Sequence, residues 1–81
     1  MEVRNSPNAT RALRRCNKRE LIREKIQLLA RDPLALSANI KALSGRGDNR
    51  LRVQDWRVIF EFRDGFVEIK EVVPCGGAYR E

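Results

Sequence analysis

Residues 50–63 read Arg50-Leu-Arg-Val-Gln-Asp-Trp-Arg-Val-Ile-Phe-Glu-Phe-Arg63, and this stretch decides the fold. Apolar and polar side chains alternate through it with a period of two, which is typical of strands that bury one face. Gln54-Asp55 interrupts the alternation as a turn, and Asp64-Gly65 follows as a hairpin turn that supplies positive φ angles. A further strand, ended by Pro74, has as its alternating residues Val67, Ile69, Glu71 and Val73. The second half of the chain therefore predicts an antiparallel sheet.

The first half of the chain has the helical period of 3.6 residues instead. After a short extended start at Val3, Ser6-Pro7 supplies an N-cap followed by a proline at the first helical position. Apolar residues then recur at helical spacing, so a helix is predicted from about residue 7 to residue 16, with Cys16 on its buried face.

A second helix is predicted from about residue 18 to residue 31. Asp32-Pro33 ends it, because the residue before a proline is pushed out of the α region. Residues 34–43 are mildly apolar and are expected to be irregular or to form one helical turn. The resulting order, β-α-α-β-β-β, predicts an α+β fold with two N-terminal helices packed on one face of a mostly antiparallel sheet. We expect a single domain spanning residues 1–81.

The composition excludes several kinds of active site. The 81 residues include no histidine, which removes the usual general base near neutral pH and the commonest metal ligand. The two cysteines, Cys16 and Cys75, are too few for a zinc finger or a disulfide scaffold. A chain this short has no room for a separate cofactor domain, so we expect neither a metal nor a cofactor. Function is expected on a surface or in a shallow groove.

The N-terminal residues indicate the compartment. Met1–Asn8 is polar and lacks the pattern of a signal peptide. The longest apolar stretch is far shorter than the roughly 20 residues that a membrane span needs. Together with the low cysteine count, this favours a cytoplasmic, reduced protein with no membrane partner.

The positive charge is concentrated in the first 31 residues. The chain has 17 Lys and Arg against 11 Asp and Glu, a net charge of +6, and residues 1–31 hold nine basic against three acidic side chains, which accounts for all of it. Such asymmetry favours a nucleic-acid or acidic-protein partner, although solvated cations on the outer faces of helices are the simpler alternative. The candidate RNA contacts at the junction of the two helices are Arg14, Arg15, Lys18 and Arg19.

A second basic group lies in the predicted sheet. Arg50 and Arg52 point to the same face of their strand, because side chains alternate. Arg57 opens the neighbouring strand across a short turn. If all three share a face, their rigid donor forks suit phosphate oxygens, and Tyr79 in the tail could close over them. Trp56 could offer a stacking surface for a base, although a tryptophan there more often belongs to the core.

Three segments carry a resemblance to a known family: Asn39-Ile-Lys-Ala-Leu43, Arg50-Leu-Arg-Val-Gln-Asp-Trp-Arg-Val-Ile-Phe60 and Pro74-Cys-Gly-Gly-Ala-Tyr-Arg80. They resemble the RelE/ParE superfamily of bacterial type II toxins, in which the second segment is roughly Arg-Leu-Arg-Val-Gly-Asp-Tyr/Trp-Arg-Val-Ile and the third is often Pro-Arg-Gly-Gly-Ala-Tyr-Arg. The resemblance spans nearly the whole chain. The motif at residues 50–60 is quite specific, whereas the helices are not. The family fold is the compact β-α-α-β-β-β arrangement expected above.

The resemblance implies a ribosome-dependent mRNA endoribonuclease that a cognate antitoxin protein neutralises. Such toxins enter the ribosomal A site and cut mRNA by attack of a 2′-hydroxyl on the adjacent phosphate, without a metal. By position, Arg50 and Arg52 match the basic pair of the family. Arg57 matches the arginine that contacts the reacting phosphate. Tyr79 matches a C-terminal tyrosine assigned to proton transfer or base stacking.

Cys75 departs from the family pattern, since relatives usually have an arginine after the proline. In the ribonuclease members that basic residue is thought to stabilise the phosphate or the leaving group, and losing one such charge lowers the rate by on the order of 10²–10³. The sequence therefore leaves open whether the chain is fully active, attenuated or inactive. It also leaves open a ParE-like inhibitor of DNA gyrase and a non-catalytic module that binds RNA or the antitoxin. The set Arg50, Arg52, Arg57 and Tyr79 favours the ribonuclease branch.

Overall fold

Three consecutive antiparallel strands form the centre of the fold and confirm the predicted sheet. The computed structural model describes residues 1–43 and 47–74. The strands are β3 (Asn49–Val53), β4 (Trp56–Arg63) and β5 (Phe66–Pro74). The turn between β4 and β5 uses Gly65 at a φ of 82°, a conformation that glycine adopts without strain. The turn between β3 and β4 places Gln54, a residue with a Cβ, at a φ of 53°.

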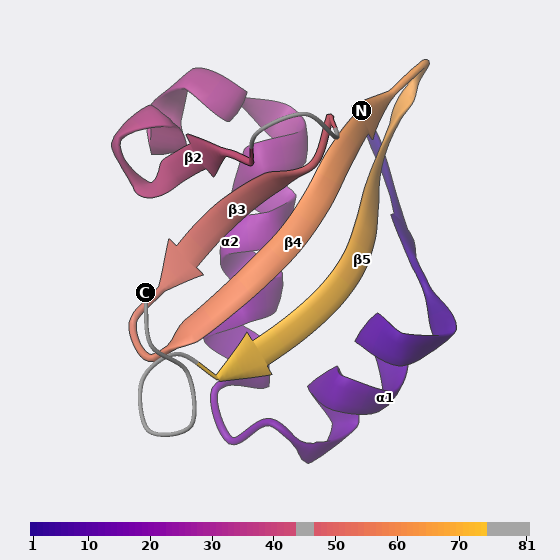
Figure 1. Cartoon of the computed structure of the whole chain (residues 1–81), viewed down its shortest axis with the longest axis vertical. Helices are drawn as coiled ribbons and strands as arrows, with labels where there is room; N and C mark the ends of the chain where they lie inside the picture. The colour runs from indigo at the N-terminus through magenta and orange to yellow at the C-terminus, as the bar shows by residue number, and fades with distance from the viewer. Residues whose placement is uncertain (44–46, 75–81) are drawn as a thin grey trace.

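Two short strands complete the sheet at its edges, in the order β1-β5-β4-β3-β2 (Figure 1). β1 (Glu2–Asn5) runs parallel to β5, so the extended start predicted at Val3 is confirmed. β2 (Ile40–Ala42) pairs antiparallel with β3 and was not predicted. It follows a 3₁₀ helix, η1 (Pro33–Asn39), where an irregular stretch or one helical turn was expected. A strand of this length has too little alternation to be recognised, and pairing with β3 defines it.

The two helices begin and end close to the predicted residues. They are α1 (Pro7–Arg15) and α2 (Arg19–Arg31). The Ser6 hydroxyl accepts a hydrogen bond from the Ala9 N–H at 3.0 Å and donates one to the Lys70 carbonyl oxygen at 2.7 Å, so the helix cap also ties α1 to β5. Asp32 ends α2, as the following proline predicts. None of the helices in the described residues has the length and apolar character needed to cross a membrane.

Both helices bury their apolar residues against the same face of the sheet. In Figure 1, α2 lies behind β3 and β4, while α1 lies beside the end of β5. The opposite face of the sheet, turned toward the viewer, is not covered by any helix of the described residues. The main helical and strand members of the core are Leu13, Ile22, Ile26, Leu29, Leu51, Val58, Phe60, Val67, Ile69 and Val72.

A β-bulge in β5 changes the alternation that the sequence suggests. Phe60 pairs with Ile69, but its neighbour Ile59 pairs with Glu71, so Lys70 is an extra residue in β5. The bulge turns Val72 into the core, where it is 3% exposed. The regular alternation of Val67, Ile69, Glu71 and Val73 is therefore wrong after residue 69, because an inserted residue shifts the faces of those that follow.

Candidate nucleic-acid interface

The three arginines of the sheet lie on its open face. Arg52 and Arg57 are direct partners across β3 and β4, and Arg50 lies opposite Ile59. Direct partners in an antiparallel pair project to the same side, so the register brings all three guanidinium groups to one face. The core residues Leu51 and Val58 are partners in the same ladder and point to the other side. The geometric condition that the sequence left open is thus met.

The surroundings of the arginines differ. Arg52 is exposed, and its Nε donates to the Gln54 carbonyl oxygen at 3.3 Å. Arg50 and Arg57 are half-buried, and the Nε atom of Arg57 is shielded from solvent. Guanidinium groups stay charged at all physiological pH values and present several N–H donors in a fixed plane. A phosphate group that bridges β3 and β4 at this point would meet donors from both strands.

Trp56 does not belong to this arginine face. It is the partner of Val53, which is 4% exposed, and it packs against the core. Its position next to Arg57 in the sequence suggested a stacking surface beside the arginines. Neighbours in a strand point to opposite faces, so the two side chains lie on opposite sides of the sheet. Trp56 therefore packs against the core, which was the alternative to a stacking surface.

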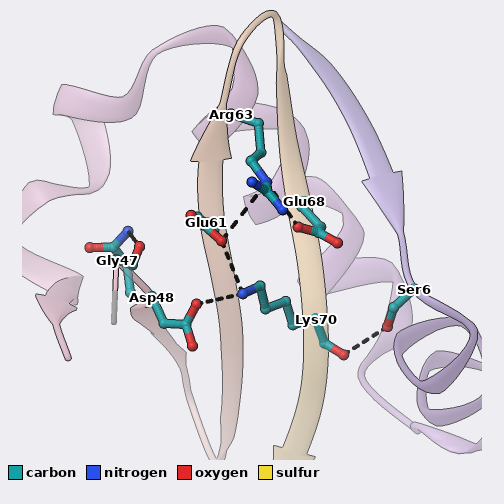
Figure 2. Close-up of polar contacts among 8 residues, drawn as sticks. Ser6, Gly47, Asp48, Glu61, Arg63, Glu68 and Lys70 are labelled. Carbon is teal, nitrogen blue, oxygen red and sulfur yellow. Dashed lines mark hydrogen bonds and ion pairs between the residues drawn. The ribbon is translucent and has the colours of Figure 1, made fainter. Parts of the chain in front are cut away.

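The far end of the open face carries an ion-pair network that the sequence did not predict. Lys70 Nζ lies 2.7 Å from Asp48 Oδ1 and 3.0 Å from Glu61 Oε1, and Arg63 Nε lies 3.2 Å from Glu68 Oε1 (Figure 2). The hydrogen bond to Asp48 and then that to Glu61 hold the pKa of Lys70 above its ordinary value of 10.5, against a smaller opposing effect of desolvation. Alternation alone puts Lys70 and Glu61 on the polar face of their strands, but finding the network from sequence would also require the pairing of β4 with β5 and the position of Asp48, which no local pattern gives.

The basic cluster at the helix junction forms a separate surface. Arg14, Lys18 and Arg19 line a cleft of about 570 Å³ between the end of α1 and the start of α2. Arg19 Nη1 donates to the carbonyl oxygen of Arg14 at 3.3 Å, near the negative end of the α1 dipole. Arg15 is exposed in the last turn of α1. Cys16 is buried as a free thiol, as predicted, and its Sγ accepts the Lys18 N–H at 3.3 Å.

The remaining candidate residues, Cys75 and Tyr79, lie outside the described residues, so their predicted roles stay predictions. Within residues 1–43 and 47–74, no group of three acidic, cysteine or histidine side chains could hold a metal ion.

Comparison with known proteins identifies the fold. No protein-family model matches the chain, and no curated protein matches its sequence. Among solved structures, a chain of the archaeal RelE–RelB complex from Pyrococcus horikoshii is similar with a TM-score of 0.75 and 24% identity, over 93% of this chain and 94% of that one. YafQ from E. coli is similar with a TM-score of 0.75 and 17% identity, over 98% of each chain. A chain of the intact E. coli RelBE toxin–antitoxin complex gives 0.74 and 17%, over 94% and 98%.

Each of these matches covers nearly the full length of this chain and of the chain compared with it. The chain therefore has an α+β fold of the RelE type, shared with RelE and YafQ proteins, and the fold expected from the sequence is confirmed.

Proposed function

We propose that this chain is the toxin of a type II toxin–antitoxin module and cleaves mRNA on the ribosome. Two observations support the proposal. The fold is similar to that of RelE and YafQ, and several of the matching structures are toxin–antitoxin complexes. The observation that carries the proposal is the arginine face, where the register gathers Arg50, Arg52 and Arg57 on the uncovered side of the sheet.

The reaction would need no metal and no histidine. The 2′-oxygen of a ribose attacks the adjacent phosphorus, the bond from phosphorus to the 5′-oxygen of the next nucleotide breaks, and a 2′,3′-cyclic phosphate and a 5′-hydroxyl result. One proton leaves the 2′-hydroxyl and one is delivered to the 5′-oxygen. Negative charge accumulates on the phosphate oxygens in the transition state, where fixed cations lower the barrier. Arg57, which is half-buried with its Nε atom shielded from solvent, is the residue proposed to contact the reacting phosphate, and Arg50 and Arg52 are proposed to hold the RNA strand.

Proton transfer is assigned to Tyr79 on the basis of the family resemblance alone. A free tyrosine has a pKa near ~10, so its use as a base depends on neighbouring cations that favour the phenolate. By the family resemblance, Cys75 stands where relatives usually have an arginine, and it cannot supply a positive charge. The enzyme is accordingly proposed to be attenuated as it stands.

The proposed binding partners come from the family resemblance and agree with the basic charge of the chain. The basic cluster of the helix junction, with its cleft beside Arg14, Lys18 and Arg19, is proposed to contact ribosomal RNA when the toxin occupies the A site. An acidic, partly helical antitoxin is proposed to neutralise the protein by lying against α1 and α2 or across the arginine face. Both partners place the protein in the cytoplasm.

Induction without any antitoxin tests the proposal. Growth and translation are measured in induced cells, and primer extension maps cleavage sites on their mRNA. We expect arrest of translation with discrete cuts that depend on ribosomes. Supercoiling by DNA gyrase is assayed in parallel, because a gyrase inhibitor would block it and leave mRNA intact. If the chain and its Cys75→Arg variant both leave growth, mRNA and supercoiling untouched, the protein is a non-catalytic binding module and the proposal is wrong.

A further inference from the structure

The open face of the sheet has a gradient of charge across its strands. The register aligns one row of side chains from β2 to β5, in the order Lys41, Arg50, Ile59 and Glu71. All four project to the open face, because partners in antiparallel strands share a side. The row therefore starts with two cations on β2 and β3, passes an apolar residue on β4 and ends on a carboxylate in β5.

The ion-pair network strengthens this gradient. Among the described residues, its ion pairs join three carboxylates, from Asp48, Glu61 and Glu68, to two cations, Lys70 and Arg63 (Figure 2). Glu71 adds a further negative charge in the same strand as Lys70 and Glu68. A polyanion that lies on the arginine face would meet repulsion if it continued across β5.

The side toward β2 offers a groove instead. It has a volume of about 320 Å³ and is lined by Ala38, Asn39, Ile40, Lys41, Arg50 and Arg52. This volume is at the lower end of the range for pockets that bind small ligands. Lys41 and Asn39 are exposed, while Ile40 is half-buried. The lining thus combines three cations for phosphate oxygens, an amide that can donate to and accept from a base or ribose, and an aliphatic surface.

We propose that single-stranded RNA leaves the arginine face across β2, with a nucleotide next to the cleaved bond seated in this groove. Lys41 binds its phosphate together with Arg50, and Asn39 hydrogen-bonds its base or ribose. The inference rests on the proposed function, since it assigns the path of the strand over the same site. An acidic protein segment is a different occupant for the same groove. RNA is favoured because the groove shares Arg50 and Arg52 with the arginine face and is therefore continuous with it.

The test uses the purified full chain and a fluorescent 2′-O-methyl RNA oligonucleotide, which binds but has no 2′-hydroxyl to attack. We expect Lys41→Ala to weaken binding by about three- to fivefold, the scale for one exposed charge contact. The slope of log affinity against log salt should fall by about 0.7, because one phosphate contact is lost. Arg23→Ala is the matched control. Arg23 is an exposed cation on α2, which packs on the other face of the sheet, so its loss should leave affinity unchanged.

Three results would overturn the inference. If Glu71→Gln tightens RNA binding by a larger factor than Lys41→Ala weakens it, the RNA passes over β5. If Arg57→Ala weakens RNA binding and Lys41→Ala has no effect, the proposed function stands and only the path over β2 is wrong. If Lys41→Ala weakens the binding of a labelled polyglutamate peptide but not the binding of RNA, the groove belongs to a protein partner. If no variant alters RNA affinity, the proposed function itself has failed.

Discussion

Arg52 and Arg57 face each other as direct partners in the ladder of β3 and β4. Two like charges at such a position are unfavourable by themselves, since opposite residues of an antiparallel pair lie close together. The pairing is explained if the position serves an anion, because an RNA phosphate between the strands would be attracted by both groups.

Replacing Arg57 tests that explanation. Arg57→Ala, made in the Cys75→Arg background so that activity is measurable, should lower ribosome-dependent mRNA cleavage by on the order of 10²–10³. Arg57→Lys should recover only part of it, because lysine keeps the charge but lacks the planar fork. Cleavage is measured by primer extension on mRNA translated in vitro with purified toxin. Arg23→Ala should cleave normally, and full activity of a folded Arg57→Ala protein would remove this residue from the site.

Gln54 stands in the left-handed region at a φ of 53°. The conformation disfavours a residue with a Cβ, and glycine adopts it without that penalty. Gln54→Gly relieves the strain but also makes the unfolded chain more flexible, which offsets part of the gain. We expect a net increase of about 0.5–1 kcal/mol in the free energy of unfolding. Thermal unfolding followed by circular dichroism should show a melting temperature higher by a few degrees, whereas an unchanged or lower one would contradict the argument.

The elements that the sequence predicted are those with a long local pattern. β4 and α2 repeat their apolar residues over several periods, so period and capping residues defined them. β2 and the bulge at Lys70 depend on contacts between distant segments, which no local pattern encodes. The sequence could predict that Arg50 and Arg52 share a face, because side chains alternate along a strand. It could not predict that Arg57 joins them, because that depends on how β3 and β4 pair. Residues adjacent in a strand do not share a face, and Trp56 therefore points away from its neighbour Arg57.

The charge of Lys70 should make the free energy of unfolding fall at alkaline pH. Its pKa in the folded protein is raised above 10.5, first by Asp48 and then by Glu61. A group with a raised folded pKa contributes stability that is complete below its unfolded pKa and is lost as the pH rises through the folded pKa. Lys70→Met should therefore be less stable than the natural chain at pH 8, and the difference should shrink above pH 10.5. Urea unfolding across this range measures it.

A matched pair isolates the cause. In an Asp48→Asn background the strongest hydrogen-bond partner of Lys70 loses its charge, so the same Lys70→Met substitution should show a smaller difference and a weaker pH dependence. A difference between the natural chain and Lys70→Met that stays constant from pH 8 to above pH 10.5 would mean that Lys70 acts by packing and not by charge.

Cys75 decides how active the chain is, according to the family resemblance. The stretch Pro74-Cys75-Gly76-Gly77 contains no charged side chain that could replace the usual arginine. If the deficit is one missing charge at the transition state, Cys75→Arg should raise mRNA cleavage by on the order of a hundredfold. Cys75→Ala should change little, because it removes a thiol that carries no positive charge. Equal cleavage by the natural chain and Cys75→Arg would show that the cysteine is no lesion, and a loss of cleavage in Cys75→Ala would give the thiol a direct role.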